Sequence, residues 1–235
     1  DIRYLNVAFI AVFILSSGIL YGTSGRFTQF TYSIVDSQAS FESSLSFPLG
    51  MFSLFFLIRG RYLWCLINVL LAVITLKRIV LVAIAVSVLI WLIPRRMRGL
   101  ILNPYVATVI TMACLIVTVQ FGQGTFDSWI SDTLGVASND LTKGRRVLWG
   151  GLMQSINFSY DDFVLYGIGL GKSVSELQVL LHRERVLLHS DLLTILIEFG
   201  FLSVLVFTFL LNAQRSLEER ILAAYLSILF LTDNV

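Results

Sequence analysis

Charged residues are scarce in this chain, and their scarcity argues against an ordinary soluble domain. Only 14% of the 235 residues are Asp, Glu, Lys or Arg, against roughly 25% in soluble globular proteins. Hydrophobic residues make up 57%, and the mean hydropathy is +0.84. The apolar runs are also too long and too frequent to be the buried helices of a soluble protein. The composition therefore predicts an integral membrane protein.

Cysteine and proline are also rare. Cys65 and Cys114 both fall inside apolar runs, so we expect neither a disulfide nor a metal site and interpret both as small apolar residues. Pro48, Pro94 and Pro104 lie near the ends of apolar runs, which leaves most runs uninterrupted. The sequence lacks an Asp-x-Asp pair of the kind that holds a catalytic divalent metal. We therefore expect no metal and no other cofactor.

Six apolar segments predict membrane-spanning helices, and a seventh begins at Ile221. The second, third and fourth are shorter than the roughly 20 residues that cross a bilayer upright, so flanking residues must lengthen them or the bilayer must thin. The chain begins with Asp1, and we take it to be a fragment of a longer protein. The six segments are Arg3–Tyr21, Phe47–Ile58, Tyr62–Leu76, Ile79–Ile93, Leu102–Phe121 and Leu188–Leu211.

The fold class that follows is all-α, a polytopic transmembrane helical bundle with a large external (periplasmic) loop that contains amphipathic helices. We divide the chain into N-terminal transmembrane helices over 1–121 (about five spans), the external loop over 122–187, and C-terminal transmembrane helices over 188–235.

Basic residues in short loops predict which side of the membrane each turn faces. When the segments are threaded in order, the connection 22–46 and the loop 122–187 are external. The external turn Lys77–Arg78 opposes this rule, so either its side chains reach lipid phosphates or they bind an anionic ligand at the outer leaflet. The cytoplasmic side receives Arg3 and three basic turns, which contain Arg59 and Arg61, then Arg95, Arg96 and Arg98, then Arg215 and Arg220.

The external loop contains a helical pattern from Arg145 to Asn157, in which apolar residues recur at intervals of three and four. The pattern predicts a helix that lies on the membrane surface or packs against the spans. Arg145 and Arg146 fall in its first turn, where cations are disfavoured unless they meet an anion. First-turn amides and guanidinium groups together suit a phosphate. The alternative is a solvated basic edge near lipid headgroups.

A glycine cluster and a polar helix start follow. Gly167, Gly169 and Gly171 permit tight turning and close backbone approach, either for packing or to offer amides to a ligand, and Lys172 extends the basic character. His189 is either a general base or a headgroup-level anchor, whereas His182 is interpreted as a surface residue. Asp191 and Glu198 are seven residues apart and share a helix face. Glu198 lies about two turns deeper, where a carboxylate needs a partner, for which a basic residue is the natural candidate.

Taken together, these motifs resemble the bacterial O-antigen ligase and O-antigen polymerase superfamily of polytopic envelope enzymes. A weaker similarity is the Lys77–Arg78 turn, with Lys in place of the Ser of the family's Ser-Arg turn, and residues 230–234 resemble a terminal acidic motif. Ser190 departs from the Asn of many members, and the chain has fewer spans than the family's usual ten or more. The residues that carry the resemblance are Gly144, Arg145 and Trp149, then Gly167, Gly169 and Gly171, then His189, Leu192, Glu198 and Gly200.

The resemblance implies a metal-independent glycosyltransferase of the bacterial inner membrane, with its active site on the periplasmic face. The donor would be a glycan linked to undecaprenyl diphosphate, and the acceptor a glycan or the lipid A-core. Membrane lipids are expected partners and a chain-length regulator is a further candidate, but no nucleic acid is expected. By the resemblance, His189, Arg145 and Arg78 are catalytic. The substrate-binding residues would be Lys77, Arg146, Gly169, Lys172, Asp191 and Glu198.

Two kinds of enzyme remain open, a polymerase that lengthens surface polysaccharide (O-antigen, capsule or exopolysaccharide) and a ligase that attaches it. We favour the polymerase because family members of that kind are more numerous. A transporter or flippase of lipid-linked or small solutes is the alternative from a different class. It would need polar or broken helices near the bilayer midplane, and Glu198 is the residue that most favours it. A passive structural subunit would leave Lys77, Arg78 and His189 unexplained.

Overall fold

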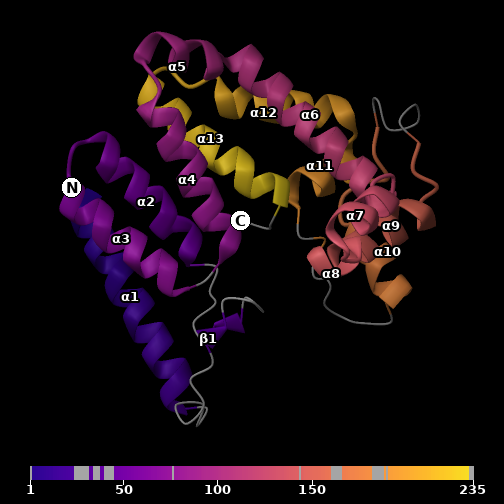
Figure 1. Ribbon diagram of the computed structural model, residues 1–235, viewed down its shortest axis with the longest axis horizontal. Coiled ribbons are helices and arrows are strands. Elements are labelled where there is room, and N and C mark those ends of the chain that lie inside the picture. Colours follow the sequence, from indigo (N-terminus) through magenta and orange to yellow (C-terminus); the bar gives the residue numbers. More distant parts are fainter. Residues whose placement is uncertain are drawn as a thin grey trace. The chain divides into compact units, whose positions relative to one another are not determined.

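The chain is all-α apart from one short ladder in the part that the structure describes. The computed structural model describes residues 2–23, 32–33, 38–39, 45–75, 77–142, 144–159, 166–181, 188 and 190–232, and helices dominate them (Figure 1). The ladder is an antiparallel pair of two-residue strands, β1 (Tyr32–Ser33) and β2 (Gln38–Ala39). The all-α expectation is confirmed.

Two compact units divide the chain between residues 92 and 93. Unit 1 contains α1 (Ile2–Thr23), α2 (Ser46–Ile58), α3 (Tyr62–Ile74) and α4 (Arg78–Leu92). The sequence-based boundaries, after residues 121 and 187, follow membrane topology instead and stay a prediction. The two-unit division places residues 122–187 in the same unit as the C-terminal helices.

Unit 1 is organised around the α2–α3 hairpin, against which α4 also packs. Contacts between aromatic rings join its helices. Phe9 of α1 lies 5.8 Å from Phe52 of α2 between ring centroids, and Phe56 of α2 lies 5.9 Å from Trp64 of α3. These contacts follow from apolar runs rich in Phe and Leu, which bury one face against their neighbours.

The basic residues of unit 1 lie at opposite ends of this hairpin. Arg59 and Arg61 lie in the connection between α2 and α3. Lys77, just before α4, places its Nζ 4.1 Å from the ring centroid of Phe47 in the first turn of α2. The Lys77–Arg78 turn is therefore at the far end of the hairpin from Arg59 and Arg61, as the threading required.

Unit 2 is built on a long helix, α6 (Pro104–Gly122), which packs against α12 (Phe201–Asn212) and α13 (Leu217–Thr232). The short helix α5 (Arg95–Ile101) precedes it. Asn103 starts α6 because its side chain accepts a hydrogen bond from the Tyr105 amide (3.0 Å) and Pro104 occupies the first helical position.

The two basic turns of unit 2 lie at the same end of this helix group. Arg220 of α13 donates from Nε to the Gln214 carbonyl (2.9 Å) and from Nη1 to the Leu102 carbonyl (3.5 Å). One side chain thereby joins the α12–α13 connection to the start of α6. The two turns therefore lie close together within the unit, and the membrane side that they face stays a prediction.

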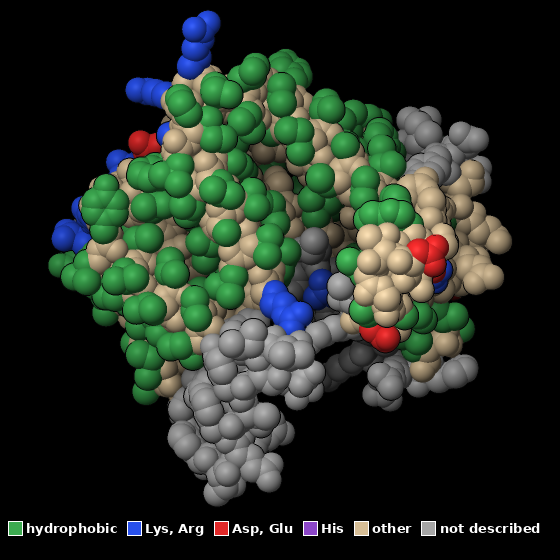
Figure 2. Space-filling view, viewed as in Figure 1, with side chains coloured by type: hydrophobic (Ala, Val, Ile, Leu, Met, Phe, Trp, Pro, Cys, Tyr) green, Lys and Arg blue, Asp and Glu red, His purple; other side chains and the backbone are tan. Residues whose placement is uncertain are grey.

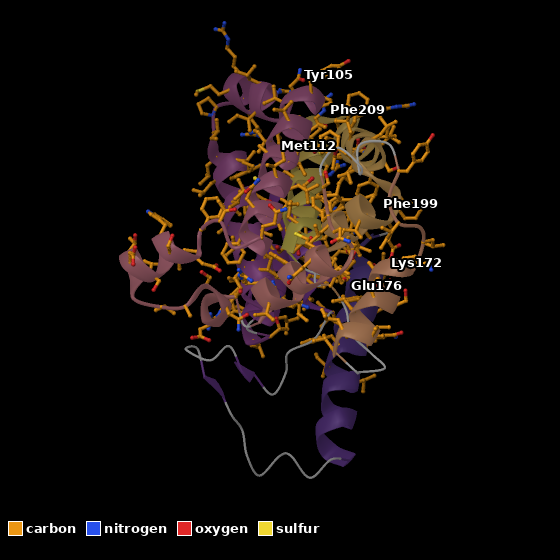
Figure 3. The ribbon with its side chains drawn as sticks, turned by 90° about the vertical axis from the view of Figure 1, so that its right-hand side faces the viewer. Tyr105, Met112, Lys172, Glu176, Phe199 and Phe209 are labelled. Carbon is orange, nitrogen blue, oxygen red and sulfur yellow. The ribbon has the colours of Figure 1, made fainter. Side chains whose placement is uncertain are left out.

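Five short helices gather toward the other end of α6 (Figure 1). In Figure 3, Tyr105 and Phe209, whose ring centroids lie 5.4 Å apart, mark the end that carries the basic turns. Lys172 and Glu176 lie toward the opposite end in the same view. The five helices are α7 (Asp127–Leu134), α8 (Ser138–Leu141), α9 (Arg145–Ser155), α10 (Lys172–Leu181) and α11 (Asp191–Phe199).

Helix α9 confirms the helix predicted from Arg145 to Asn157. Glycine allows it to cross α6 closely, because a Cβ added at Gly150 would lie 2.6 Å from the Gly122 carbonyl oxygen. Its apolar face is buried in the core of unit 2 with residues of α6, α11 and α12. The buried residues of α9 are Trp149, Leu152 and Met153.

The last complete span predicted, Leu188–Leu211, is wrong as a continuous helix. It breaks at Gly200 into α11 and α12, with φ 86° and ψ 173° at that residue. Glycine adopts this backbone without steric cost, and the last carbonyls of α11 are bonded by another segment of the chain. The apolar sequence on both sides of Gly200 conceals the break.

Only α6, in the part of the chain that the structure describes, is long and apolar enough to cross a bilayer. Five further helical segments are apolar but shorter: Ile2–Leu15, Ser46–Ile58, Tyr62–Ile74, Arg78–Leu92 and Phe201–Asn212.

Candidate functional site

The start of α11 is held by two other helices. The indole Nε1 of Trp149, on α9, donates a buried hydrogen bond to the Leu188 carbonyl (2.7 Å). Ser190 accepts from the Leu193 amide (3.3 Å) as the N-cap of α11, and its hydroxyl donates to the Leu231 carbonyl of α13 (2.8 Å). The residues before and after His189 are therefore fixed, while His189 itself lies outside the described residues.

The glycine cluster packs against the other end of α11. The Ile168 amide donates to the Ile197 carbonyl (2.8 Å), and the Gly169 amide donates to the Glu198 carbonyl (3.1 Å). A Cβ added at Gly167 would overlap backbone atoms of Ile197 and Glu198. The close approach expected of these glycines thus serves packing. The Gly169 amide, proposed for substrate binding, is already occupied.

Glu198 is buried in this contact, with 6% of its surface exposed. Its Oε1 accepts a hydrogen bond from the Ser173 hydroxyl of α10 (2.5 Å). Among the described residues Glu198 forms no ion pair, so its basic partner stays a prediction. A hydroxyl donor from a neighbouring helix contributes to satisfying the buried carboxylate.

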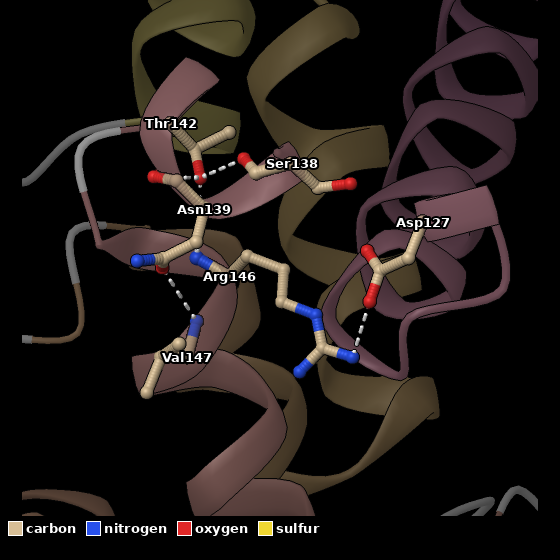
Figure 4. A network of polar contacts seen from close by, with 6 residues as sticks. All are labelled: Asp127, Ser138, Asn139, Thr142, Arg146 and Val147. Carbon is tan, nitrogen blue, oxygen red and sulfur yellow. Dashed lines mark hydrogen bonds and ion pairs between the residues drawn. The ribbon is translucent and has the colours of Figure 1, made fainter. Parts of the chain in front are cut away.

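The first turn of α9 has no open set of amides for a phosphate. The Arg146 amide donates to Thr142 Oγ1 (3.3 Å), and the Val147 amide donates to Asn139 Oδ1 (3.4 Å) (Figure 4). The Arg145 amide bonds the Thr142 carbonyl (3.3 Å). Side chains and backbone from α8 and its C-cap therefore fill the positions that a phosphate would need. The expected amide cradle at this helix start is wrong, which leaves only the guanidinium groups as donors.

Arg146 is committed to an ion pair. Its Nη2 lies 2.6 Å from Oδ2 of Asp127 on α7, with 27% and 40% of the two side chains exposed (Figure 4). This hydrogen bond lowers the pKa of Asp127 below its ordinary value. The Ser138 hydroxyl favours the charged carboxylate further, although no well-aligned hydrogen bond joins the two groups.

The other residues proposed for the site lie at helix starts. Arg145, Lys172 and Asp191 are the first residues of α9, α10 and α11. Lys172 is exposed and Arg145 and Asp191 are half-buried. Lys77 and the exposed Arg78 belong to unit 1. Gly169 directly contacts two of the other proposed residues. Its carbonyl accepts a hydrogen bond from the Lys172 amide (3.2 Å), and its amide donates to the Glu198 carbonyl (3.1 Å).

A cavity of about 560 Å³ lies beside Arg146, between the end of α6 and α9. Carboxamides and an aromatic ring contribute to its lining, together with the glycines of α9. The lining residues are Gln123, Arg146, Val147, Gly150, Gly151, Met153, Gln154, Asn157 and Phe158.

Sequence reasoning missed several residues of this region. Asp127, Ser173 and the carboxamides of the cavity carry no motif of their own, because their partners lie on other helices. Asn139 could have been found, since Asn shortly before a helical pattern is a common capping residue.

No family model matches this chain, and neither a curated protein nor a solved structure does.

Proposed function

We propose that the chain is part of a membrane glycosyltransferase that uses a glycan carried on undecaprenyl diphosphate. The acceptor is a sugar hydroxyl of a growing surface polysaccharide. The proposal rests on the resemblance of its motifs to the O-antigen ligase and polymerase superfamily, and on the way those motifs meet in unit 2.

The convergence of three separated motifs is the observation that carries the proposal. Trp149 of the first motif bonds the Leu188 carbonyl at the start of α11. Gly169 of the second bonds the Glu198 carbonyl at the end of the same helix. Each contact joins residues about 30 to 40 positions apart. Two of the motifs therefore contact, at its two ends, the helix that carries the third, and this arrangement supports the proposal.

The exposed apolar surface supports a membrane location. Hydrophobic side chains cover most of the visible face of the described residues (Figure 2). On α3, α4, α6 and α12, residues Leu63, Leu89, Val109 and Leu210 are each at least 62% exposed. Soluble monomers rarely expose large apolar side chains to this extent on so many helices, whereas lipid tails cover them at no cost.

The reaction is a displacement at the anomeric carbon of the donor. The acceptor hydroxyl oxygen forms a bond to that carbon, the bond from the carbon to the diphosphate oxygen breaks, and undecaprenyl diphosphate leaves. His189 takes the hydroxyl proton as general base. By the resemblance, the guanidinium groups of Arg145 and Arg78 and the Lys77 ammonium are the groups assigned to the charge on the departing diphosphate.

Transfer by purified full-length protein, supplied with lipid-linked glycan, tests the proposal. Products resolved by size should lengthen with the wild type. Arg145→Ala should lower the rate about 100-fold, the typical loss for one charge-stabilising donor, and His189→Ala should block transfer while carrier-lipid binding persists. Arg215→Ala, at the opposite end of unit 2, is the matched control and should transfer normally.

Absence of transfer by the wild type would refute the proposal, and normal transfer by Arg145→Ala at normal abundance would refute the role of that arginine. The two enzyme types differ in a cell that lacks the gene. Single-unit chains on the surface indicate a polymerase, which we favour, whereas long chains stranded on the carrier lipid indicate a ligase.

A transporter is the second candidate, favoured by the break at Gly200 beside buried Glu198. Broken helices form substrate and ion sites in transporters. Here, however, the carbonyls of Ile197 and Glu198 at the break already accept hydrogen bonds from the glycine cluster. Proton-coupled solute uptake in reconstituted vesicles that is abolished by Glu198→Gln would place the transporter first.

A further inference from the structure

The cavity beside Arg146 has a lining whose chemistry differs from that of a diphosphate site. Its positive charge is already neutralised, because Asp127 lies 2.6 Å from the guanidinium. No other lysine or arginine is among its lining residues. A diphosphate requires several cationic donors at close range, so this cavity does not suit the leaving group.

Three carboxamide side chains of the cavity lining have no hydrogen-bond partner among the described residues. The side chains of Gln123, Gln154 and Asn157 are exposed and make no hydrogen bond among the described residues. Each carboxamide offers both donors and acceptors, as do the hydroxyl groups of a sugar. Met153 and the half-buried Phe158 add apolar surface of the kind that receives the carbon-bearing face of a sugar ring.

Hydrogen bonds at two helix ends hold the backbone that carries these groups. The Asn157 amide donates to the Gln154 carbonyl (3.2 Å) and the Phe158 amide to the Met153 carbonyl (2.8 Å). With Asn157 in the left-handed region at φ 49°, these bonds form the Schellman motif that ends many helices. Gly124 ends α6 in the same way, with φ 84°. The carboxamides thus project from two fixed helix ends.

We propose that this cavity binds the sugar portion of a substrate, as a glycan subsite separate from the diphosphate site. The inference rests on the proposed function and adds its sugar-binding residues. Its volume of about 560 Å³ falls within the range of roughly 300–1,000 Å³ typical of small-ligand pockets. A neutral or singly anionic oligosaccharide matches its charge.

Saturation-transfer NMR tests the subsite, because it detects weak binding. The full-length protein in nanodiscs is mixed with short oligosaccharides released from the surface polysaccharide of the source organism. Gln154→Ala and Asn157→Gly should each weaken binding about five-fold or more, as expected for the loss of one or two hydrogen bonds. Glycine at 157 retains the left-handed backbone, so this variant removes only the carboxamide. Gln214→Ala removes a carboxamide at the other end of unit 2 and should bind like the wild type.

Equal binding by wild type and both cavity variants would overturn the inference, as would an absence of any saturation transfer. In the transfer assay, the variants should raise KM and leave kcat unchanged. A raised KM for the acceptor places the acceptor glycan in the cavity, and a raised KM for the lipid-linked donor places the donor glycan there. Transfer with unaltered KM values would refute the glycan subsite but agree with the glycosyltransferase proposal. Oligosaccharide binding without any transfer would refute the glycosyltransferase proposal but agree with a sugar-binding cavity.

Discussion

Trp149→Phe isolates the contact that fixes the start of α11. Phenylalanine keeps an aromatic ring in the core near Phe121, whose centroid lies 6.4 Å from that of Trp149, but it cannot donate to the Leu188 carbonyl. Leu188 is only 2% exposed, so its carbonyl loses a donor where water has little access. A buried carbonyl without a partner costs about 1–3 kcal/mol.

This cost should appear as easier local opening of α11. Amide exchange in its first turn, followed by mass spectrometry, should accelerate roughly 5- to 150-fold, since each 1.4 kcal/mol is a factor of ten. Trp129→Phe is the matched control because Trp129, on α7, is 62% exposed. In this variant, amide exchange in the first turn of α11 should match that of the wild type. Unchanged exchange in Trp149→Phe would refute the inference that α9 positions the residues around His189.

Three further substitutions test the packing around α11 and α9. Gly167→Ala should lower the free energy of unfolding, measured by SDS titration in mixed micelles, by about 1–3 kcal/mol, since the added Cβ meets backbone atoms of Ile197 and Glu198; a neutral effect would contradict the contact. Ser190→Ala should cost about 1–3 kcal/mol through loss of the cap and of the bond to the Leu231 carbonyl, while Ser203→Ala, which removes only a solvent-exposed hydrogen bond to the Phe199 carbonyl (3.0 Å), should stay within about 0.5 kcal/mol. Asp127 has a lowered pKa, so its contribution to stability is fully present above the unfolded pKa of about 3.9 and is lost as pH falls through the lower folded value. Asp127→Asn should therefore reduce the fall in stability below about pH 4, and an unchanged acid profile would show that the ion pair with Arg146 does not form.

The helices of this chain could be predicted because their signals are local. Apolar runs marked α2, α3, α4 and α6 to within a few residues, and the spacing of Leu148, Trp149, Leu152 and Met153 marked α9. The break at Gly200 could not be predicted in the same way. Its apolar neighbours continue on both sides, and the amides that bond the end of α11 come from residues 168 and 169, about 30 positions earlier.

The roles of neighbouring residues were harder to separate. Arg145 and Arg146 look like one basic pair in the sequence, but successive residues on a helix point about 100° apart. Arg146 consequently meets Asp127 and the cavity, and its pairing depends on α7 rather than on its own helix. The pattern placed Trp149 on the apolar face of a predicted helix, but the partner of its indole hydrogen bond lies 39 residues further along the chain.

Whether the Lys77–Arg78 turn and the start of α9 face the same compartment is decided most directly by labelling single cysteines with a membrane-impermeant thiol reagent. In full-length protein whose Cys65 and Cys114 are replaced by serine, Lys77→Cys and Val147→Cys should both react in intact spheroplasts. Arg96→Cys should react only after the membrane is opened. Reaction of positions 77 and 147 from opposite sides would contradict a single outer-face site for the diphosphate.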